Sequence, residues 1–213
     1  MLPLITLGQF NINGTYPGLV EQIAPHAPEI DQTLPHWEQR VEYTRFTQRI
    51  KKPDQAFEDY ELPKVYRFVD RTKKIGDIFM AASGVFIVSA KAKAIIETHA
   101  KDRALLWPIE VKNPREDVEG DFFGLYIPTH LNAFDDKNTP REAYTRSQPS
   151  GFVQSNYPDN KNIGKFRLLP DVYEGHALWW DSEIPATEFF VSDALFEELK
   201  AASLTLPKAA KVK

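Results

Sequence analysis

The chain has 213 residues, of which 42% are hydrophobic and 26% are charged, and its formal net charge at pH 7 is −4. This composition is typical of a globular protein and fits one large domain, or one domain with an extension. The absence of cysteine excludes disulfides, thiolate zinc sites and cysteine nucleophiles. No apolar run approaches the roughly 18 residues of a membrane-spanning helix, and the first residues show no signal-peptide pattern. We therefore expect a soluble cytoplasmic protein without a membrane partner.

The first third of the chain gives weak and mixed signals. Leu19–Ile23 indicates a short helical turn, and Trp37–Ile50 fits a helix or a strand equally well. Phe57–Leu62 and Val65–Val69 are short apolar runs typical of strands. Pro63 separates them, and a proline there favours a break or an edge position because it cannot donate a ladder hydrogen bond.

The clearest pattern in the sequence occurs twice. Val85–Val88 and Glu188–Val191 are apolar runs typical of strands, and each is followed by a serine and then by apolar residues at helical spacing. Ser89 and Ser192 stand at the N-cap positions, where a hydroxyl accepts a free backbone N–H of the first helical turn. The sequence therefore predicts an α+β fold, with a mixed or antiparallel sheet and two Ser-capped helices from two similar strand–helix units.

Further strands are expected between these two units, together with one long polar segment. Phe122–Ile127, Phe166–Leu169 and Leu178–Trp180 have the short apolar pattern of strands. Asp135–Asn162 is rich in Asn, Asp, Pro and Ser and predicts a long loop or a mobile insertion. Long loops in compact domains are often functional, which makes this segment a candidate contact region.

The sequence lacks the motifs that signal cofactor, phosphate or metal chemistry. It has no Gly-x-Gly-x-x-Gly, no phosphate-binding Gly-Lys-Ser or Gly-Lys-Thr, and no His-Glu-x-x-His. Its five histidines are scattered, and no two have metal-ligand spacing. We predict no catalytic residue, no metal and no cofactor. A small hydrolase-type enzyme with an unrecognised carboxylate or histidine site is the alternative. The short basic stretch Arg67–Lys74 belongs to an acidic chain, so we expect no nucleic-acid partner.

Acidic residues dominate one part of the C-terminal third. From Leu168 to Leu199 there are eight acidic residues and no Lys or Arg. This pattern indicates either a solvated surface or an acidic surface that steers a cationic partner. Trp179 and Trp180 are adjacent in a predicted strand and so point to opposite faces, where either one ring is an outward anchor or both are buried. The candidate partner-binding residues are Asp135, Asp136, Asp171, Glu174, Trp179, Trp180, Asp181, Glu183 and Glu188.

Several short segments follow one another in a recognisable order. They are Asp77-Ile78, Gly84–Ser89, Trp107–Val111, Gly124–Tyr126, Leu178–Trp180 and Phe190–Asp193. In order and spacing they resemble immunity protein family eleven of bacterial polymorphic toxin systems, over about residues 62–212. The resemblance implies a small cytoplasmic protein, encoded beside a toxin, that binds the toxin and blocks it. No catalytic residues come with this family.

This resemblance gives the expected domain organisation. Residues 1–60 match nothing comparable, and we treat them as an N-terminal extension or variable segment packed on the core. Residues 61–213 form the expected α+β immunity-type domain, with a cognate toxin as its partner.

Overall fold

The computed structural model describes residues 2–6, 14–26, 57–69, 75–81, 85–100, 103–114, 118–147, 151–155, 163–184 and 188–212. Trp37–Ile50, whose secondary structure the sequence left open, lies outside these ranges.

The chain forms two compact units, each with its own buried hydrophobic cluster. The unit that we call the N-terminal unit consists of Phe10–Lys93 and Leu105–Tyr126. The C-terminal unit consists of Met1–Gln9, Ala94–Ala104 and Ile127–Lys213. The chain therefore passes between the units more than once, and the expected boundary at residue 60 does not coincide with this division.

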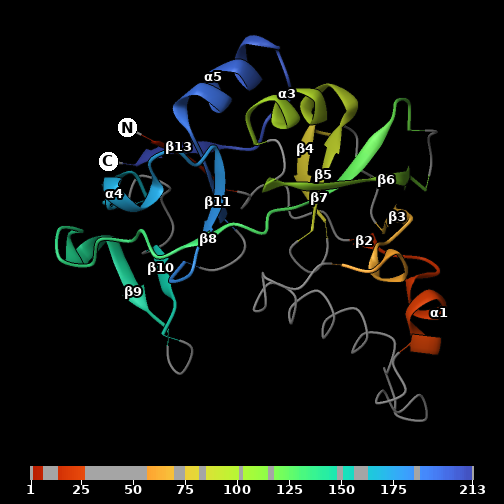
Figure 1. The fold of residues 1–213 in the computed structure, drawn as a ribbon, viewed down its shortest axis with the longest axis horizontal. Helices are drawn as coiled ribbons and strands as arrows, with labels where there is room; N and C mark the ends of the chain where they lie inside the picture. Colours follow the sequence, from red (N-terminus) through yellow and green to blue (C-terminus); the bar gives the residue numbers. More distant parts are fainter. Residues whose placement is uncertain are drawn as a thin grey trace. The chain divides into compact units, whose positions relative to one another are not determined.

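The N-terminal unit contains a six-stranded sheet in the order β2-β3-β6-β7-β5-β4 (Figure 1). β3 and β6 run parallel and the other neighbours run antiparallel, so the sheet is mixed. Its elements are β2 (Gly14–Thr15), α1 (Leu19–Ile23), β3 (Val65–Phe68), β4 (Ile78–Met80), β5 (Phe86–Ser89), β6 (Leu105–Lys112) and β7 (Phe122–Tyr126).

The central strand β6 shows how the sequence builds this sheet. Trp107, Ile109 and Val111 are buried and alternate with exposed Pro108 and Glu110, because successive side chains of a strand point to opposite faces. One face of β6 thus contributes to the hydrophobic cluster of this unit.

A glycine opposite Trp107 makes room for the indole ring. Gly124 of β7 is the register partner of Trp107, and a Cβ atom at Gly124 would lie 2.2 Å from Cζ2 of the ring. The indole Nε1 donates a hydrogen bond to the carbonyl oxygen of Pro63 at 2.9 Å. The glycine therefore allows a large ring to be buried with its polar atom satisfied.

The C-terminal unit contains a five-stranded sheet in the order β13-β1-β12-β11-β8 and a separate hairpin of β9 and β10. β11 and β8 run parallel, and the other neighbours run antiparallel. The strands are β1 (Leu2–Thr6), β8 (His130–Leu131), β9 (Tyr144–Arg146), β10 (Val153–Ser155), β11 (Leu178–Asp181), β12 (Glu188–Val191) and β13 (Ala209–Val212). The helices α4 (Pro170–Tyr173) and α5 (Asp193–Ala201) belong to this unit.

The two ends of the chain meet in this sheet. β1 pairs antiparallel with both β12 and β13, with Leu4 opposite Phe190 on one side and Ala210 on the other. A segment that the sequence assigned to an N-terminal extension thus supplies an inner strand of the C-terminal unit.

The repeated strand–serine–helix pattern is confirmed at both positions. β5 leads into α3 (Ala90–Ala100), and the Ala92 N–H donates to Ser89 Oγ at 3.3 Å. β12 leads into α5, and the Leu195 N–H donates to Ser192 Oγ at 3.3 Å. The predicted α+β fold class is confirmed as well.

Three local expectations were wrong. Phe57–Leu62 is not a strand but contains a 3-10 helix at Asp59–Glu61, where the Glu58 N–H bonds to the Glu61 carboxylate at 3.0 Å. Phe166–Leu169 forms only an isolated bridge between Leu168 and Phe134. The described part of Asp135–Asn162 is not a plain loop, because it holds a 3-10 helix and the β9–β10 hairpin. Polar side chains at or near these positions form hydrogen bonds with backbone and side-chain groups. The spacing of apolar residues in the sequence does not reveal such bonds.

The two helix caps predict a measurable loss of stability. We expect Ser192→Ala to lower the free energy of unfolding by about 1 kcal/mol, because the Leu195 N–H loses its acceptor. Ser89→Ala should cost more, since the Ser89 hydroxyl also donates to Asp77 Oδ1 at 2.7 Å. Urea unfolding measures both. Ser192→Asp keeps an acceptor and should match the wild type; equal losses in Ser192→Asp and Ser192→Ala would contradict the capping role.

Candidate functional site

A buried carboxylate at the end of β11 organises the charged region of the C-terminal unit. Asp181 is 2% exposed, and its Oδ2 accepts hydrogen bonds from the N–H groups of Ala133 (2.8 Å) and Phe134 (2.9 Å). Its Oδ1 accepts from the Glu183 N–H at 2.9 Å. Burial raises the pKa of Asp181, and the three N–H donors oppose this shift by favouring the ionised form. Asp181 therefore holds the segment after β8 against the turn after β11.

Two carboxylates beside this turn are bridged by one guanidinium. Arg146 Nη2 lies 2.7 Å from Glu183 Oε2 and 3.5 Å from Asp136 Oδ1. Arg141 Nη1 lies 3.5 Å from the same Asp136 oxygen, and the Tyr144 hydroxyl donates to it. The hydrogen bond from Tyr144, followed by the two arginine charges, lowers the pKa of Asp136. We call these five residues the arginine–carboxylate cluster.

The cluster is anchored on the core through one ring. Tyr144 is 4% exposed and packs edge-on against Phe134 and Phe166, with centroid distances of 5.3 and 6.5 Å. The guanidinium carbons of Arg141 and Arg146 lie 5.4 and 6.0 Å from its ring centroid, within cation–π range.

The remaining acidic candidates divide into structural and exposed groups. Asp135 closes a turn, because its Oδ1 accepts from the N–H groups of Lys137 and Asn138, each at 3.1 Å. The side chain of Asn138, the largest cause, lowers the pKa of Asp135 by a further hydrogen bond. Asp171 of α4 and Glu174, the C-cap residue of that helix, are in contrast exposed and form no ion pair with any described residue.

Both tryptophans of β11 are inside the C-terminal unit. Trp179 is fully buried between the rings of Tyr173 (5.8 Å) and Phe190 (5.5 Å), both nearly parallel to it. Trp180 is 2% exposed and meets Phe189 at 6.1 Å. The alternative in which one of these rings is an outward anchor is therefore wrong, because both faces of β11 are covered. Glu188 opens β12, and its side chain lies outside the described atoms.

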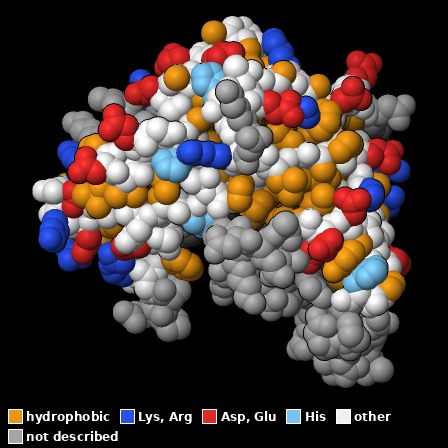
Figure 2. All heavy atoms as spheres, viewed as in Figure 1, with side chains coloured by type: hydrophobic (Ala, Val, Ile, Leu, Met, Phe, Trp, Pro, Cys, Tyr) orange, Lys and Arg blue, Asp and Glu red, His pale blue; other side chains and the backbone are white. Residues whose placement is uncertain are grey.

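The structure thus brings some of the sequence candidates together and separates others. Asp136, Asp181 and Glu183 lie around one turn, whereas Asp171 and Glu174 project from α4. Figure 2 shows acidic and basic side chains interspersed on the visible face of the C-terminal unit. Sequence reasoning missed Arg141, Tyr144 and Arg146 because they lie in the segment assigned to a loop. Their closeness to Asp135 and Asp136 in the sequence was the available signal.

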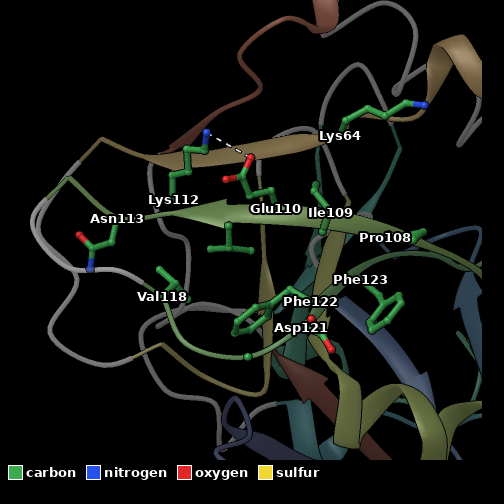
Figure 3. Close-up of a pocket in the computed structure, with 12 residues that line it drawn as sticks. Lys64, Pro108, Ile109, Glu110, Lys112, Asn113, Val118, Asp121, Phe122 and Phe123 are labelled. Carbon is green, nitrogen blue, oxygen red and sulfur yellow. Dashed lines mark ion pairs between the residues drawn. The ribbon is translucent and has the colours of Figure 1, made fainter.

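The N-terminal unit holds a separate open groove of about 870 Å³, beside β6 and β7. Figure 3 shows Val118 and Phe122 on one side of β6, and the Glu110–Lys112 ion pair at 3.1 Å on the other. Its ionisable lining residues are Lys64, Glu110, Lys112 and Asp121, and none of the lining residues is a histidine. The lining offers mixed polar and apolar contacts rather than a recognisable acid–base pair.

Within the described ranges, no group of three or more His, Asp or Glu residues has an arrangement that could hold a metal ion. None of the described helices has the length and apolar character needed to cross a bilayer.

The chain has a mixed α+β fold and a cluster of charged residues on its C-terminal unit. The chain belongs to the Immunity protein family (Imm11), whose family model matches residues 19–210. It is an immunity protein that neutralises a toxin. The match confirms the resemblance and extends it upstream of residue 62, into the part of the chain that the sequence left unassigned. No curated protein matches the chain.

Replacing the Asp181 carboxylate tests whether it organises this region. We expect Asp181→Asn to lower the free energy of unfolding by about 1–3 kcal/mol, because in either orientation the amide NH₂ faces at least one of the three backbone N–H donors. Urea unfolding gives the value. Asp171→Asn removes an exposed carboxylate from the same unit and should change stability by less than about 0.5 kcal/mol. Equal stability of the two variants would show that Asp181 has no special structural role.

Proposed function

We propose that this immunity protein neutralises its toxin by binding it directly, without catalytic turnover, in the cytoplasm. The observation that carries this proposal is the family match over nearly the whole chain. A hydrolase would need an acid, a base and a nucleophile held together in a pocket. His99 Nε2 lies 2.6 Å from Glu198 Oε2, but this ion pair joins α3 to α5 and does not line the described groove.

We further propose that the exposed carboxylates of α4 take part in the contact. Asp171 and Glu174 belong to the acid-only stretch from Leu168 to Leu199, and no described residue neutralises either charge. Their field therefore extends into solvent, where it accelerates encounter with a cationic partner. Leu169, which precedes α4 and is 38% exposed, adds an apolar contact at the same place.

Asp136 and Glu183 have a different place in this proposal. Their two charges are compensated by Arg141 and Arg146, so they contribute little to long-range attraction. Trp179, Trp180 and Asp181 are buried and support the surface from beneath rather than forming it. Asp193, Glu197 and Glu198 also lie beside cationic or histidine side chains. We therefore assign the steering contribution to Asp171 and Glu174.

Association kinetics with the toxin encoded beside this gene test both parts of the proposal. We expect the double variant Asp171→Lys, Glu174→Lys to associate about tenfold more slowly at low salt, with a weaker dependence on salt. The reason is that reversal of both charges removes the attraction that steers a cationic toxin.

A matched control has the same change of charge in the other unit. Glu21→Lys with Glu119→Lys reverses two exposed acids of the N-terminal unit, and Glu21, like Asp171, lies in the first turn of a short helix. We expect this control to associate nearly as fast as the wild type. Equal slowing in both double variants would show that only the net charge of the protein matters and would contradict a role for Asp171 and Glu174. Absence of any binding by the wild type would overturn direct neutralisation.

A further inference from the structure

The open groove of the N-terminal unit exists because β6 and β7 separate before β6 ends. β7 begins at Phe122, opposite Ile109, whereas β6 continues beyond this pair. The carbonyl oxygen of Asp121 accepts a hydrogen bond from the Ala90 N–H at 2.9 Å, so the segment before β7 stays with the β5 side of the sheet. Gly120, with a φ of 98°, turns the chain there. The last residues of β6 consequently have no β7 residue opposite them, and the groove lies in this gap (Figure 3).

The groove combines apolar walls with charged residues. Val111, Val118 and Phe122 line it, and all three belong to the hydrophobic cluster of this unit or pack against it. Val111 is buried, whereas Val118 and Phe122 are half-buried and remain accessible. Glu110 and Lys112 line the groove from the other side of β6 (Figure 3). An apolar side chain that enters the groove would leave water and be flanked by charges, which is typical of an anchor residue at a protein interface.

The register of the sheet places two cations side by side next to this groove. β3 and β6 run parallel, with Arg67 opposite Lys112 and Val65 opposite Glu110. Register partners on neighbouring strands project from the same face, and their backbones are about 4.8 Å apart. Lys112 Nζ lies 3.1 Å from Glu110 Oε2, whereas the exposed Arg67 forms no ion pair with any described residue. The group of Arg67, Glu110 and Lys112 thus has two positive charges and one negative charge.

This arrangement of charge is unfavourable for the sheet alone. Like charges directly opposite one another on neighbouring strands are destabilising. Glu110 offsets only one of the two cations, and both Arg67 and Lys112 remain accessible to a partner. A local conflict of this kind is typical of functional sites, where an interaction with a partner compensates for the loss of stability.

We propose that the toxin inserts an apolar side chain into this groove and places a neighbouring carboxylate against Arg67 and Lys112. The inference rests on the proposed function, because it assumes a directly bound toxin. The excess positive charge selects the acid, since a cation would be repelled and a neutral group would leave the charge uncompensated. The guanidinium of Arg67 has five N–H donors and can bind one carboxylate through two of them.

This contact and the acids near α4 place different demands on the toxin. Asp171 and Glu174 act over a long range on the overall charge of the toxin, before contact. The groove and Arg67 act at contact, on one apolar side chain and one carboxylate. A toxin with a net positive charge can satisfy both demands, because a single carboxylate at the contact changes its overall charge little.

Methyl NMR of the full-length protein tests the use of the groove. The probe is the toxin encoded beside this gene, inactivated and added unlabelled in excess. We expect the methyl signals of Val111 and Val118 to shift in the complex, because a toxin side chain then packs against them. Val20 and Ile23 are buried on α1 in the same unit and do not line the groove, so their signals should change little. The same shifts at high concentration of the immunity protein alone would assign the groove to a second copy and overturn the proposal.

Reversing the charge of Arg67 separates a role in binding from a role in folding. We expect Arg67→Glu to bind the toxin about tenfold more weakly, because the carboxylate of the toxin then meets another acid. The melting temperature of this variant should equal or exceed that of the wild type, since the like-charge pair with Lys112 becomes a pair of opposite charges. A lower melting temperature would show that Arg67 supports the fold and would overturn its role as a contact.

A matched control makes the same change of charge in the other unit. Lys137 is exposed in the C-terminal unit, and Lys137→Glu should bind the toxin nearly as tightly as the wild type. Equal weakening in Arg67→Glu and Lys137→Glu would overturn the pairing of Arg67 with a carboxylate. Toxin binding that leaves the signals of Val111 and Val118 unshifted would overturn the groove contact and leave direct neutralisation standing, whereas failure of the wild type to bind would overturn both.

Discussion

Three backbone N–H groups converge on one buried carboxylate, that of Asp181, and the charged surface of the C-terminal unit depends on this contact. The donors come from the segment after β8 and from the turn after β11, which are distant in the sequence. A buried carboxylate without such donors would be strongly destabilising, and buried N–H groups without an acceptor would be costly as well. Each side of the contact therefore requires the other, and together they place Asp136 and Glu183 where Arg146 can reach both.

The arginine–carboxylate cluster acts through position more than through net attraction. Ion pairs that are partly exposed, such as Arg146 with Asp136 and Glu183, usually contribute about 0–1 kcal/mol each. Their larger effect is to neutralise two acids and to fix β9 against the core through Tyr144. The uncompensated acids Asp171 and Glu174 are then left for a partner. Their field acts over a long range and without direction.

The meeting of both chain ends in one sheet constrains how the C-terminal unit forms. β1 lies between β12 and β13, so the unit is complete only when residues from the two ends are paired. Pairings between residues far apart in sequence carry a large loop-closure cost and form late. The stacked rings of Tyr173, Trp179 and Phe190 come from α4, β11 and β12, and their apolar burial offsets part of this cost.

The sequence by itself determined what local interactions decide. The α+β class, the strands around Val85–Val88 and Glu188–Val191, and the caps at Ser89 and Ser192 follow from side-chain period and from a hydroxyl next to free N–H groups. The resemblance to the family also rested on the order of these local units. Tertiary structure alone decided the place of β1, the burial of both tryptophans, and the contact of Arg146 with both Asp136 and Glu183. These features depend on which distant segments are brought into contact, and the period of a strand is the same whether one of its faces or both are covered.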